Sequence, residues 1–326
     1  MRALVVGGAG YIGSIVAAHL VEAGHNVTVA DNLLKGHKDA VPPEASFAEI
    51  DILDATAITD VVGRGFDAVL HFAALSLVGE SVNEPVRYFR ANVAGTLNLL
   101  DAMRMAGVPR LVFSSTAATY GDPDEVPIVE TAPTRPTNPY GASKLAVDHA
   151  IAFECAATGL GAVSLRYFNV AGASGGRGER HDPETHLIPL VLQAAAGTRD
   201  HVQVFGTDYP TPDGTAVRDY IHVDDLARAH LLALEAADTA GHRIYNLGNG
   251  AGFSVREVID AARQVTGRRI NAVEVGRRAG DPAVLVASSE RIRAELGWTP
   301  EKPELETMIA DAWAFATTTT TTATTP

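Results

Sequence analysis

Cysteine, long apolar runs and positive charge are all scarce in this sequence, and each scarcity excludes a class of protein. Cys155 is the single cysteine, so no internal disulfide framework can form and the composition fits a reducing compartment. No run of about 18 or more apolar residues is present to span a bilayer. The 26 Lys and Arg residues stand against 39 Asp and Glu, and the net charge of −13 repels nucleic acid and anionic membranes. Any phosphate that binds here therefore needs local donors.

What is present is ordinary for a folded globular protein. Apolar residues make up 46% and charged residues 20% of the 326 residues, unlike the composition of disordered chains. At roughly 100–200 residues per domain, this length allows one large or two modest domains. The chain enters a strand-like apolar run at Arg2 with no charged leader or cleavage site before it, so we expect a cytoplasmic protein.

Short β-rich segments alternate with amphipathic helical segments through the first half of the chain. The β-rich segments are residues 3–6, 27–31, 68–73 and 111–115, and two later ones, 163–168 and 244–247, are expected to join the same sheet. This alternation is typical of an α/β fold with a doubly wound parallel sheet of the Rossmann type.

Gly- and Pro-rich stretches interrupt the later elements and indicate a second, smaller domain. Residues 172–183 and 206–214 are of this kind, and such loops suit a substrate lid better than a core. We expect a larger sheet domain of residues 1–168 and 217–249, and a discontinuous C-terminal substrate domain of residues 169–216 and 250–316. Residues 317–326 are nearly all threonine without an apolar period, so a disordered tail is expected there.

A glycine-rich turn follows the first strand. It reads Gly7-Gly-Ala-Gly10-Tyr-Ile-Gly13 and leads into a helix with an apolar period. Glycines at these positions allow a tight turn, close approach of a pyrophosphate and close helix-to-strand packing. The free amides and the dipole at the helix N-terminus then favour the phosphates. A glycine triplet alone is a weak signal, and an ordinary strand-to-helix turn is the alternative.

Residues at the ends of the next strands strengthen the dinucleotide interpretation. Asp31 closes the second strand, 18 residues beyond Gly13, where a carboxylate can accept hydrogen bonds from both ribose hydroxyls of adenosine. Its charge also repels a 2′-phosphate, which favours NAD over NADP; a solvated strand-end acid is the alternative. Asp51 follows the third strand, where we expect the adenine edge. The small residues Ala73 and Ala74 at the fourth strand end allow close approach of the diphosphate.

A hydroxyl-rich strand end and a tyrosine–lysine pair carry the predicted chemistry. Thr116 ends the fifth strand, and Tyr140 and Lys144 follow at a spacing of four, so both point the same way on a helix. A phenol normally titrates near pH ~10. A neighbouring ammonium and a nicotinamide cation favour the phenolate, which should lower the pKa of Tyr140. Tyr140 can then take a hydroxyl proton while hydride leaves for the nicotinamide, with Thr116 bonded to the same hydroxyl. A surface tyrosine–lysine pair is the alternative.

Further motifs join this pair into a pattern that resembles the extended short-chain dehydrogenases/reductases, and within them the nucleotide-sugar 4-epimerases. They are Phe72-Ala-Ala-Leu with Gly79-Glu-Ser-Val, Asn92-Val-Ala-Gly-Thr, Tyr167-Phe-Asn169 and Arg218-Asp-Tyr-Ile-His-Val. The similarity runs from Met1 to about Trp313. It implies an NAD-dependent isomerase that inverts carbon 4 of a UDP-hexose through a 4-keto sugar. It also implies that UDP-glucose and UDP-galactose are interconverted, that NAD is retained through turnover, and that the protein is a homodimer.

The resemblance assigns residues to each ligand. NAD contacts are expected at Gly7, Gly10, Tyr11, Ile12, Gly13, Asp31, Asn32, Asp51, Ile52, Phe72, Ala73, Ala74, Asn92, Ser114, Tyr140, Lys144 and Tyr167. Substrate contacts are expected at Thr116, Asn169, His186, Leu187, Phe205, Arg218 and Arg278, and the catalytic group is Tyr140, Lys144 and Thr116. Guanidinium forks in an acidic chain also suit a diphosphate on chemical grounds alone. Surface ion pairs are the alternative for the arginines, and plain core packing is the alternative for Phe205.

Departures from the family pattern bear on the rival activities. Ser76 stands where several relatives carry a lysine, so cationic help to the nicotinamide from that position is lost. Leu285 lies near a position where hexose-restricted relatives carry a bulkier aromatic residue, which leaves N-acetylated and other UDP sugars open. Thr116 is followed by Ala117 and Ala118, where a 4,6-dehydratase needs an acid pair and a decarboxylase usually has an acid. A non-catalytic NAD-binding regulator is the alternative from another class.

No metal site is expected. His181 and His186 lie five apart in a Gly- and Pro-rich loop without a matching ligand cluster, so we interpret them as loop polar groups. His222 lies in an apolar-flanked run and is expected to be a core histidine with satisfied hydrogen bonds. Cys155 is expected on the buried face of a helix.

Overall fold

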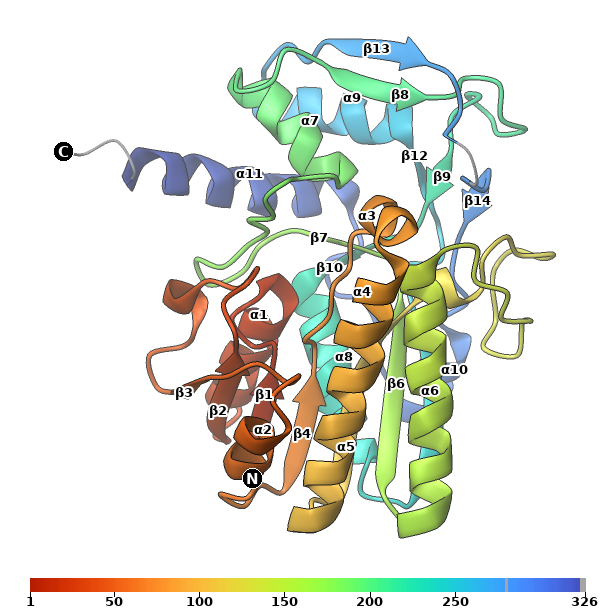
Figure 1. Cartoon of the computed structure of the whole chain (residues 1–326). Coiled ribbons are helices and arrows are strands. Elements are labelled where there is room, and N and C mark those ends of the chain that lie inside the picture. The colour runs from red at the N-terminus through yellow and green to blue at the C-terminus, as the bar shows by residue number, and fades with distance from the viewer. Residues whose placement is uncertain (279–280, 323–326) are drawn as a thin grey trace.

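In the computed structural model, residues 1–278 and 281–322 are described, and they form a larger lobe built on one sheet and a smaller lobe above it (Figure 1). The large sheet has the strand order β11-β6-β5-β4-β1-β2-β3, and every neighbouring pair in it is parallel. Its strands are β1 (Arg2–Val6), β2 (Asn26–Asp31), β3 (Ser46–Glu49), β4 (Ala68–His71), β5 (Arg110–Thr116), β6 (Gly161–Tyr167) and β11 (Gly241–Leu247). The expected doubly wound parallel sheet is confirmed.

Helices cover both faces of this sheet because its strands are apolar on both sides. Successive residues of β1 alternate between two cores: Val5 packs with one cluster, whereas Leu4 and Val6 pack with the other. The first cluster lies under α1 (Tyr11–Glu22) and α8 (Val223–Ala236), and the second lies under α2 (Ala55–Val62), α5 (Gly95–Ala106) and α6 (Pro139–Thr158). Cys155 is buried on α6, as expected.

Shorter elements complete the larger lobe. Between β4 and α5 the chain forms α3 (Val78–Asn83), α4 (Pro85–Phe89) and the π-helical turn η2 (Arg90–Ala94). Single turns η1 (Lys38–Ala40) and η3 (Ala117–Thr119) follow β2 and β5, and α10 (Glu290–Leu296) packs beside β11. Among the helices of residues 1–278 and 281–322, none combines the length and the apolar character needed to cross a membrane.

The smaller lobe has its own core and small sheets. The strands β7 (Asn169–Ala171), β8 (Val202–Phe205) and β9 (Val217–Arg218) pair with the later strands β10 (Tyr220–His222), β13 (Ala272–Val275), β12 (Phe253–Ser254) and β14 (Val284–Leu285). The helices are α7 (Leu187–Ala196), α9 (Val255–Thr266) and α11 (Leu305–Thr322). Val191, Val258 and Met308, one from each helix, meet in one apolar cluster. The division into two domains at the residues given above stays a prediction.

The end of the chain differs from the expectation for residues 317–326. Helix α11 continues through Thr322 in place of a disordered tail, and residues 323–326 lie outside the described part of the chain. The hydroxyl of Thr317 donates to the carbonyl of Trp313 at 2.9 Å, and that of Thr318 donates to Ala314 at 2.8 Å. Thr317 and Thr318 therefore bond their hydroxyls to the backbone of their own helix, which is anchored by buried Met308.

Candidate active site

A cavity of about 640 Å³ opens at the carboxyl ends of the sheet strands and continues beneath the smaller lobe. Ligands bind at this edge in open α/β sheets, because the loops that follow the strands converge there. Most of the predicted cofactor residues line it: Gly7, Gly10, Tyr11, Ile12, Gly13, Asp31, Asn32, Asp51, Ile52, Phe72, Ala73, Ala74, Ser114, Tyr140, Lys144 and Tyr167. The structure thus brings the carboxyl ends of six sheet strands, β1 to β6, around one volume.

The glycine-rich turn is packed so tightly that side chains would not fit. Gly7 has φ of +81°, and a Cβ there would lie 2.3 Å from the amide nitrogen of Ala73. A Cβ on Gly13 would lie 2.3 Å from the carbonyl oxygen of Gly7, so α1 can start directly against the turn. Gly10 precedes the first residue of α1 and faces the cavity. This cradle of bare backbone at a helix N-terminus fits a dinucleotide pyrophosphate.

Asp31 is held at the end of β2 by backbone amides. Its carboxylate accepts hydrogen bonds from Ala9 at 3.0 Å and from Leu33 at 2.8 Å, one on each oxygen. Burial raises the pKa of this carboxyl group, and the two amide bonds offset part of that rise. Each oxygen keeps a second lone pair for a ribose hydroxyl. Beside it, Asn32 donates to Asp51 at 3.1 Å, so the two acids expected around the adenosine border the same wall.

The predicted catalytic residues meet where α6 begins. Asn138 caps the helix by accepting from the amide of Gly141 at 2.9 Å, and this places Tyr140 in the first turn, facing the cavity. The hydroxyls of Tyr140 and Thr116 share a hydrogen bond. One turn further, the Nζ of buried Lys144 donates to the carbonyl of Ser114 at 2.8 Å. Sequence spacing therefore identified three groups that the fold brings together.

The expected lowering of the pKa of Tyr140 is not found in this structure. Burial raises the pKa of the phenol, and the hydrogen bond with Thr116 lowers it by less. Burial also lowers the pKa of Lys144 to about 7, so the ammonium that was expected to stabilise the phenolate is itself close to losing its charge. Burial of both groups therefore opposes the predicted lowering, which also counted the charge of the nicotinamide cation and stays a prediction for the loaded site.

A buried ion pair behind Lys144 was missed by the sequence interpretation. Asp148 lies one further turn along α6 and accepts from Arg166 at 2.9 and 3.1 Å, with both side chains almost completely buried. It also accepts from the hydroxyl of Ser115 at 3.1 Å, and its charge raises the pKa of Lys144 against the effect of burial. The spacing of four after Lys144 was the available signal, since it puts an acid on the same helix face.

The substrate residues divide into those that line the cavity and those that do not. Thr116, Asn169, His186, Leu187 and Arg218 line it. The guanidinium of Arg218 donates to the carbonyl of Val217 at 2.8 Å and reaches Asp281 at 3.3 Å.

Three predicted residues lie outside this lining. Asn92 is buried and bonds both backbone groups of Leu75, at 2.8 and 3.0 Å, which differs from the direct cofactor contact expected for it. It thereby fixes the peptide that follows β4. The guanidinium of Arg278 lies 4.5 Å from the ring centroid of Phe205 and 3.8 Å from Asp281. Direct substrate contacts of Phe205 and Arg278 stay predictions.

Additional cations border the cavity that the sequence interpretation did not include. Lys35, Arg87 and Arg90 line it, and Arg87 pairs with Glu80 at 2.7 Å. Lys35 donates to the carbonyl of Asp182 in the loop before α7. Lys35 lies four residues after Asp31, which ends β2. In a chain with a large excess of acids, a lysine so close to a predicted cofactor residue was a usable signal for a cation at the cavity.

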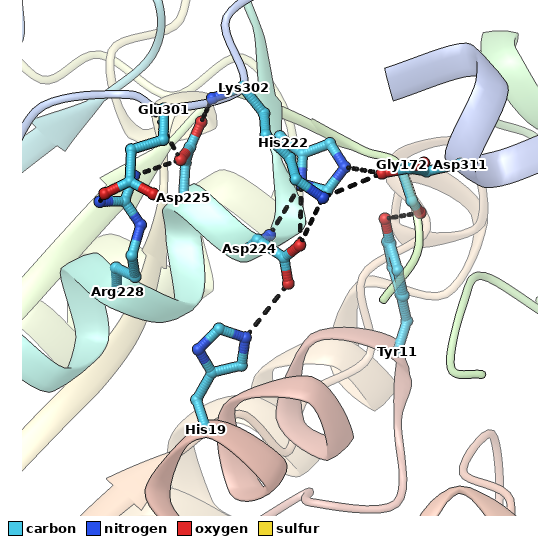
Figure 2. Close-up of polar contacts among 10 residues, drawn as sticks. All are labelled: Tyr11, His19, Gly172, His222, Asp224, Asp225, Arg228, Glu301, Lys302 and Asp311. Carbon is cyan, nitrogen blue, oxygen red and sulfur yellow. Dashed lines mark hydrogen bonds and ion pairs between the residues drawn. The ribbon is translucent and has the colours of Figure 1, made fainter. Parts of the chain in front are cut away.

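The glycine turn is braced against the smaller lobe, as Figure 2 shows. The hydroxyl of Tyr11 donates to the carbonyl of Gly172 at 2.6 Å, and Gly172 packs against the ring of His222. His222 is fully buried; one ring nitrogen accepts from the amide of Asp224 at 3.0 Å and the other lies 3.0 Å from Asp311 on α11. The prediction of a satisfied core histidine is confirmed.

Two glutamates join the two histidines of the loop before α7. We call Glu179, His181, Glu184 and His186 the loop cluster; their ligand atoms all lie within 4.8 Å of one another. The expectation that these histidines have no matching ligand cluster is therefore wrong, because it considered histidine spacing and not the intervening acids. The carboxylates raise the pKa of His186 to about 10, and the histidines lower the pKa of Glu179 to about 2.

Comparison with known proteins agrees with this geometry. The model of the NAD dependent epimerase/dehydratase family matches residues 3–248. The chain is 58% identical over 316 residues to the UDP-glucose 4-epimerase of Corynebacterium glutamicum, covering 97% of this chain and 95% of that protein. It is 62% identical over 314 residues to the UDP-glucose 4-epimerase of Streptomyces lividans, covering 96% and 95%.

Solved structures give the same result. The UDP-glucose 4-epimerase of Brucella ovis in complex with NAD superposes with a TM-score of 0.93 at 47% identity, covering 96% of this chain and 97% of that one. The enzyme of Bifidobacterium longum in complex with NAD+ and UDP superposes with a TM-score of 0.92 at 38% identity, covering 98% of both chains.

Proposed function

The chain belongs to the NAD-dependent epimerase/dehydratase family, and from that membership we propose that it is a UDP-glucose 4-epimerase. As an isomerase it interconverts UDP-glucose and UDP-galactose with NAD as cofactor. The observation that carries the proposal is the group formed by Tyr140, Thr116 and Lys144, on a cavity that runs from the glycine-rich turn to Arg218.

Residues at one end of the cavity would bind NAD, and residues at the other end would bind the diphosphate of the UDP-sugar. At one end, the bare backbone around Gly7 and the carboxylate of Asp31 would hold the pyrophosphate and ribose of NAD. At the other, Arg218 supplies a guanidinium fork that matches diphosphate oxygens, and the N-terminus of α7 at Leu187 presents free amides. The UDP end is thus held by charge and hydrogen bonds, and the hexose has room to turn.

NAD, when bound, supplies the hydride acceptor and donor that epimerisation requires. Tyr140 takes the proton from the 4-hydroxyl of the sugar and returns it after the ketone has presented its other face. Thr116, whose hydroxyl interacts with that of Tyr140, would bond the same sugar oxygen and hold it beside the phenol. Lys144, fixed by its bond to Ser114, supplies the positive charge that stabilises the phenolate when the site is loaded.

The wall beside Thr116 favours epimerisation over elimination. Ala117 and Ala118 line the cavity directly after it, so that stretch offers methyl groups where a 4,6-dehydratase needs an acid and a base. A non-catalytic NAD sensor has no need for a tyrosine, a threonine and a buried lysine around one point. Leu285 also lines the cavity, and this aliphatic wall is the reason to test N-acetylated sugars as a second substrate class.

The test is conversion of UDP-galactose to UDP-glucose by the purified full chain. Turnover with no added NAD is expected, because the cofactor is retained through the cycle. A preparation that contains NAD and leaves UDP-galactose unchanged would contradict the proposal. Parallel assays with UDP-N-acetylgalactosamine and UDP-arabinose rank the sugars and test the role of Leu285.

A homodimer is part of the proposal, and so is a cytoplasmic setting. Exposed apolar side chains project from adjacent helices, with Met105 on α5 and Phe153 on α6 at 76% and 79% exposure. The ion pair of Arg104 with Glu154 joins the two helices beside them. Phe153→Lys is expected to shift the sedimentation of the protein toward a monomer.

The single buried cysteine supports a reducing compartment.

A further inference from the structure

We propose that the loop before α7 contains a binding site for one divalent transition-metal ion, and that Zn²⁺ is the ion it fits. The ligands are the four members of the loop cluster: Glu179, His181, Glu184 and His186. Glu179, His181 and His186 also line the active cavity, so the site shares a wall with the epimerase centre, but its binding of metal does not depend on the activity proposed above.

The distances within the loop cluster match a small coordination sphere. The Nδ1 atoms of His181 and His186 lie 2.9 and 2.8 Å from one carboxylate oxygen of Glu179. His186 lies 2.9 Å from Glu184 as well. Around a tetrahedral Zn²⁺, ligand atoms at about 2.0–2.2 Å from the metal are separated by roughly 3.3 Å. The close pairs would therefore move apart by roughly half an ångström around an ion, and the pairs that lie nearer 4.8 Å would move together by about an ångström.

The chemistry of the ligand set favours Zn²⁺. Imidazole nitrogen and carboxylate oxygen are ligands that zinc prefers, whereas Mg²⁺ and Ca²⁺ prefer oxygen alone. Two carboxylates balance the charge of a dication, with both histidines neutral. Four protein ligands fill a tetrahedral sphere and leave no position for a reactive water, so we assign the ion a structural role.

The surroundings hold the ligands in place and give an ion access. One oxygen of Glu184 accepts from the amides of Thr185 and His186, both at 2.7 Å, which orients its carboxylate. Arg180, inside the loop, pairs with Asp39 through two bonds of 2.9 Å and ties the loop to the larger lobe. Glu179 and His181 also line a second cavity of about 650 Å³ beside α7 and α11. An ion can therefore enter without crossing the epimerase site.

A bound ion would restrain the loop before α7, the segment that carries the predicted substrate contacts His186 and Leu187. His186 directly precedes α7, whose first residue, Leu187, lines the active cavity. Fixing the loop at four points would hold this helix start against the larger lobe. We expect metal to protect the loop from proteolysis even when neither NAD nor substrate is added.

Metal titration of the full chain, prepared without an affinity tag and stripped with a chelator, tests the site. Co²⁺ is expected to develop the visible absorption of a four-coordinate centre, and Zn²⁺ to displace it at one ion per chain. The double variant His181→Gln/His186→Gln is expected to bind Zn²⁺ roughly a hundredfold more weakly or worse, because half of the ligands are gone. The matched control His149→Gln removes an exposed histidine on α6 and should titrate like the parent.

Two results would overturn the proposal. Parent protein that binds Zn²⁺ no more tightly than the double variant would leave the loop cluster as an ion-pair network only. Affinity for Mg²⁺ equal to that for Zn²⁺ would contradict the transition-metal assignment. If the double variant does not fold, Glu184→Gln replaces one carboxylate by an amide of the same shape. It should bind Zn²⁺ more weakly than the parent, and unchanged affinity would count against the site.

Discussion

Removing the hydroxyl of Tyr140 is expected to stop epimerisation while the fold and the bound NAD are retained. Tyr140→Phe deletes one oxygen from a partly buried ring in the first turn of α6 and leaves the hydroxyl of Thr116 without this partner. Loss of a general base costs a factor of about 10² to 10⁴, or roughly 2.7 to 5.4 kcal/mol of activation free energy. The lost hydrogen bond costs about 0.5–1.5 kcal/mol of unfolding free energy. Turnover should therefore fall far more than stability.

The assay couples UDP-glucose formation to its oxidation and follows the NADH produced. Bound NAD is measured by the nucleotide released on denaturation, and stability by urea unfolding. Tyr245→Phe is the matched control, because the buried Tyr245 donates its hydroxyl to Glu295 at 2.7 Å on the outermost strand, β11. It should lose a similar amount of stability and keep its turnover.

A Tyr140→Phe protein that keeps its NAD and turns over within about tenfold of the parent would refute the assignment of the base. Equal losses in Tyr140→Phe and Tyr245→Phe would also refute it, since the effect would then be one of packing. Loss of NAD together with activity would place the phenol in cofactor binding instead of proton transfer.

Three further changes follow from the packing. Gly7→Ala places a Cβ 2.3 Å from the backbone of Ala73 and should abolish NAD retention, which is measured on the purified protein; a normal NAD content would contradict the tight cradle. Asp148→Asn leaves Arg166 buried without its counter-charge and should cost about 3–5 kcal/mol in urea unfolding; a loss below about 1 kcal/mol would contradict this. Lys144 has a pKa of about 7 when folded and an ordinary value of 10.5. Above pH 7 the unfolded chain therefore binds more protons, so stability should rise toward pH 10 from this residue. Lys144→Met should flatten that rise in unfolding measured across this range, and an unchanged slope would count against it.

The cofactor half of the site was predictable from the sequence because its signals are local. Gly7 has a positive φ, and Gly8 and Gly13 are packed too closely for a side chain; all three follow an apolar run within the same few residues. Asp31 ends the next such run, and parallel strands align their carboxyl ends along one edge. Tyr140 and Lys144 share a helix face through a spacing of four. Each of these inferences rests on a sequence period or spacing, and the geometry of a helix or strand turns such a spacing directly into the relative positions of the side chains.

The substrate half and the loop cluster were less predictable because they depend on contacts between distant segments. Arg278 stacks on Phe205 outside the cavity lining, and the substrate contacts expected of both residues stay predictions. Asn92 was expected at the cofactor, but it is buried against Leu75. Glu179 and Glu184 lie within a few residues of His186 in the sequence. Their convergence depends on how the loop turns and on its attachment to the larger lobe.

The sequence by itself determined the succession of strands and helices, the sheet class, the glycine cradle and the meeting of Tyr140 with Lys144 on one helix face, because these follow from short-range periodicity and spacing. Only the tertiary structure decided which side chains lose their water. That loss raises the pKa of the Tyr140 phenol and lowers the pKa of Lys144 to about 7, two effects that the residue types did not reveal. Desolvation depends on every segment that packs around a group, and residue spacing along the chain carries no measure of it.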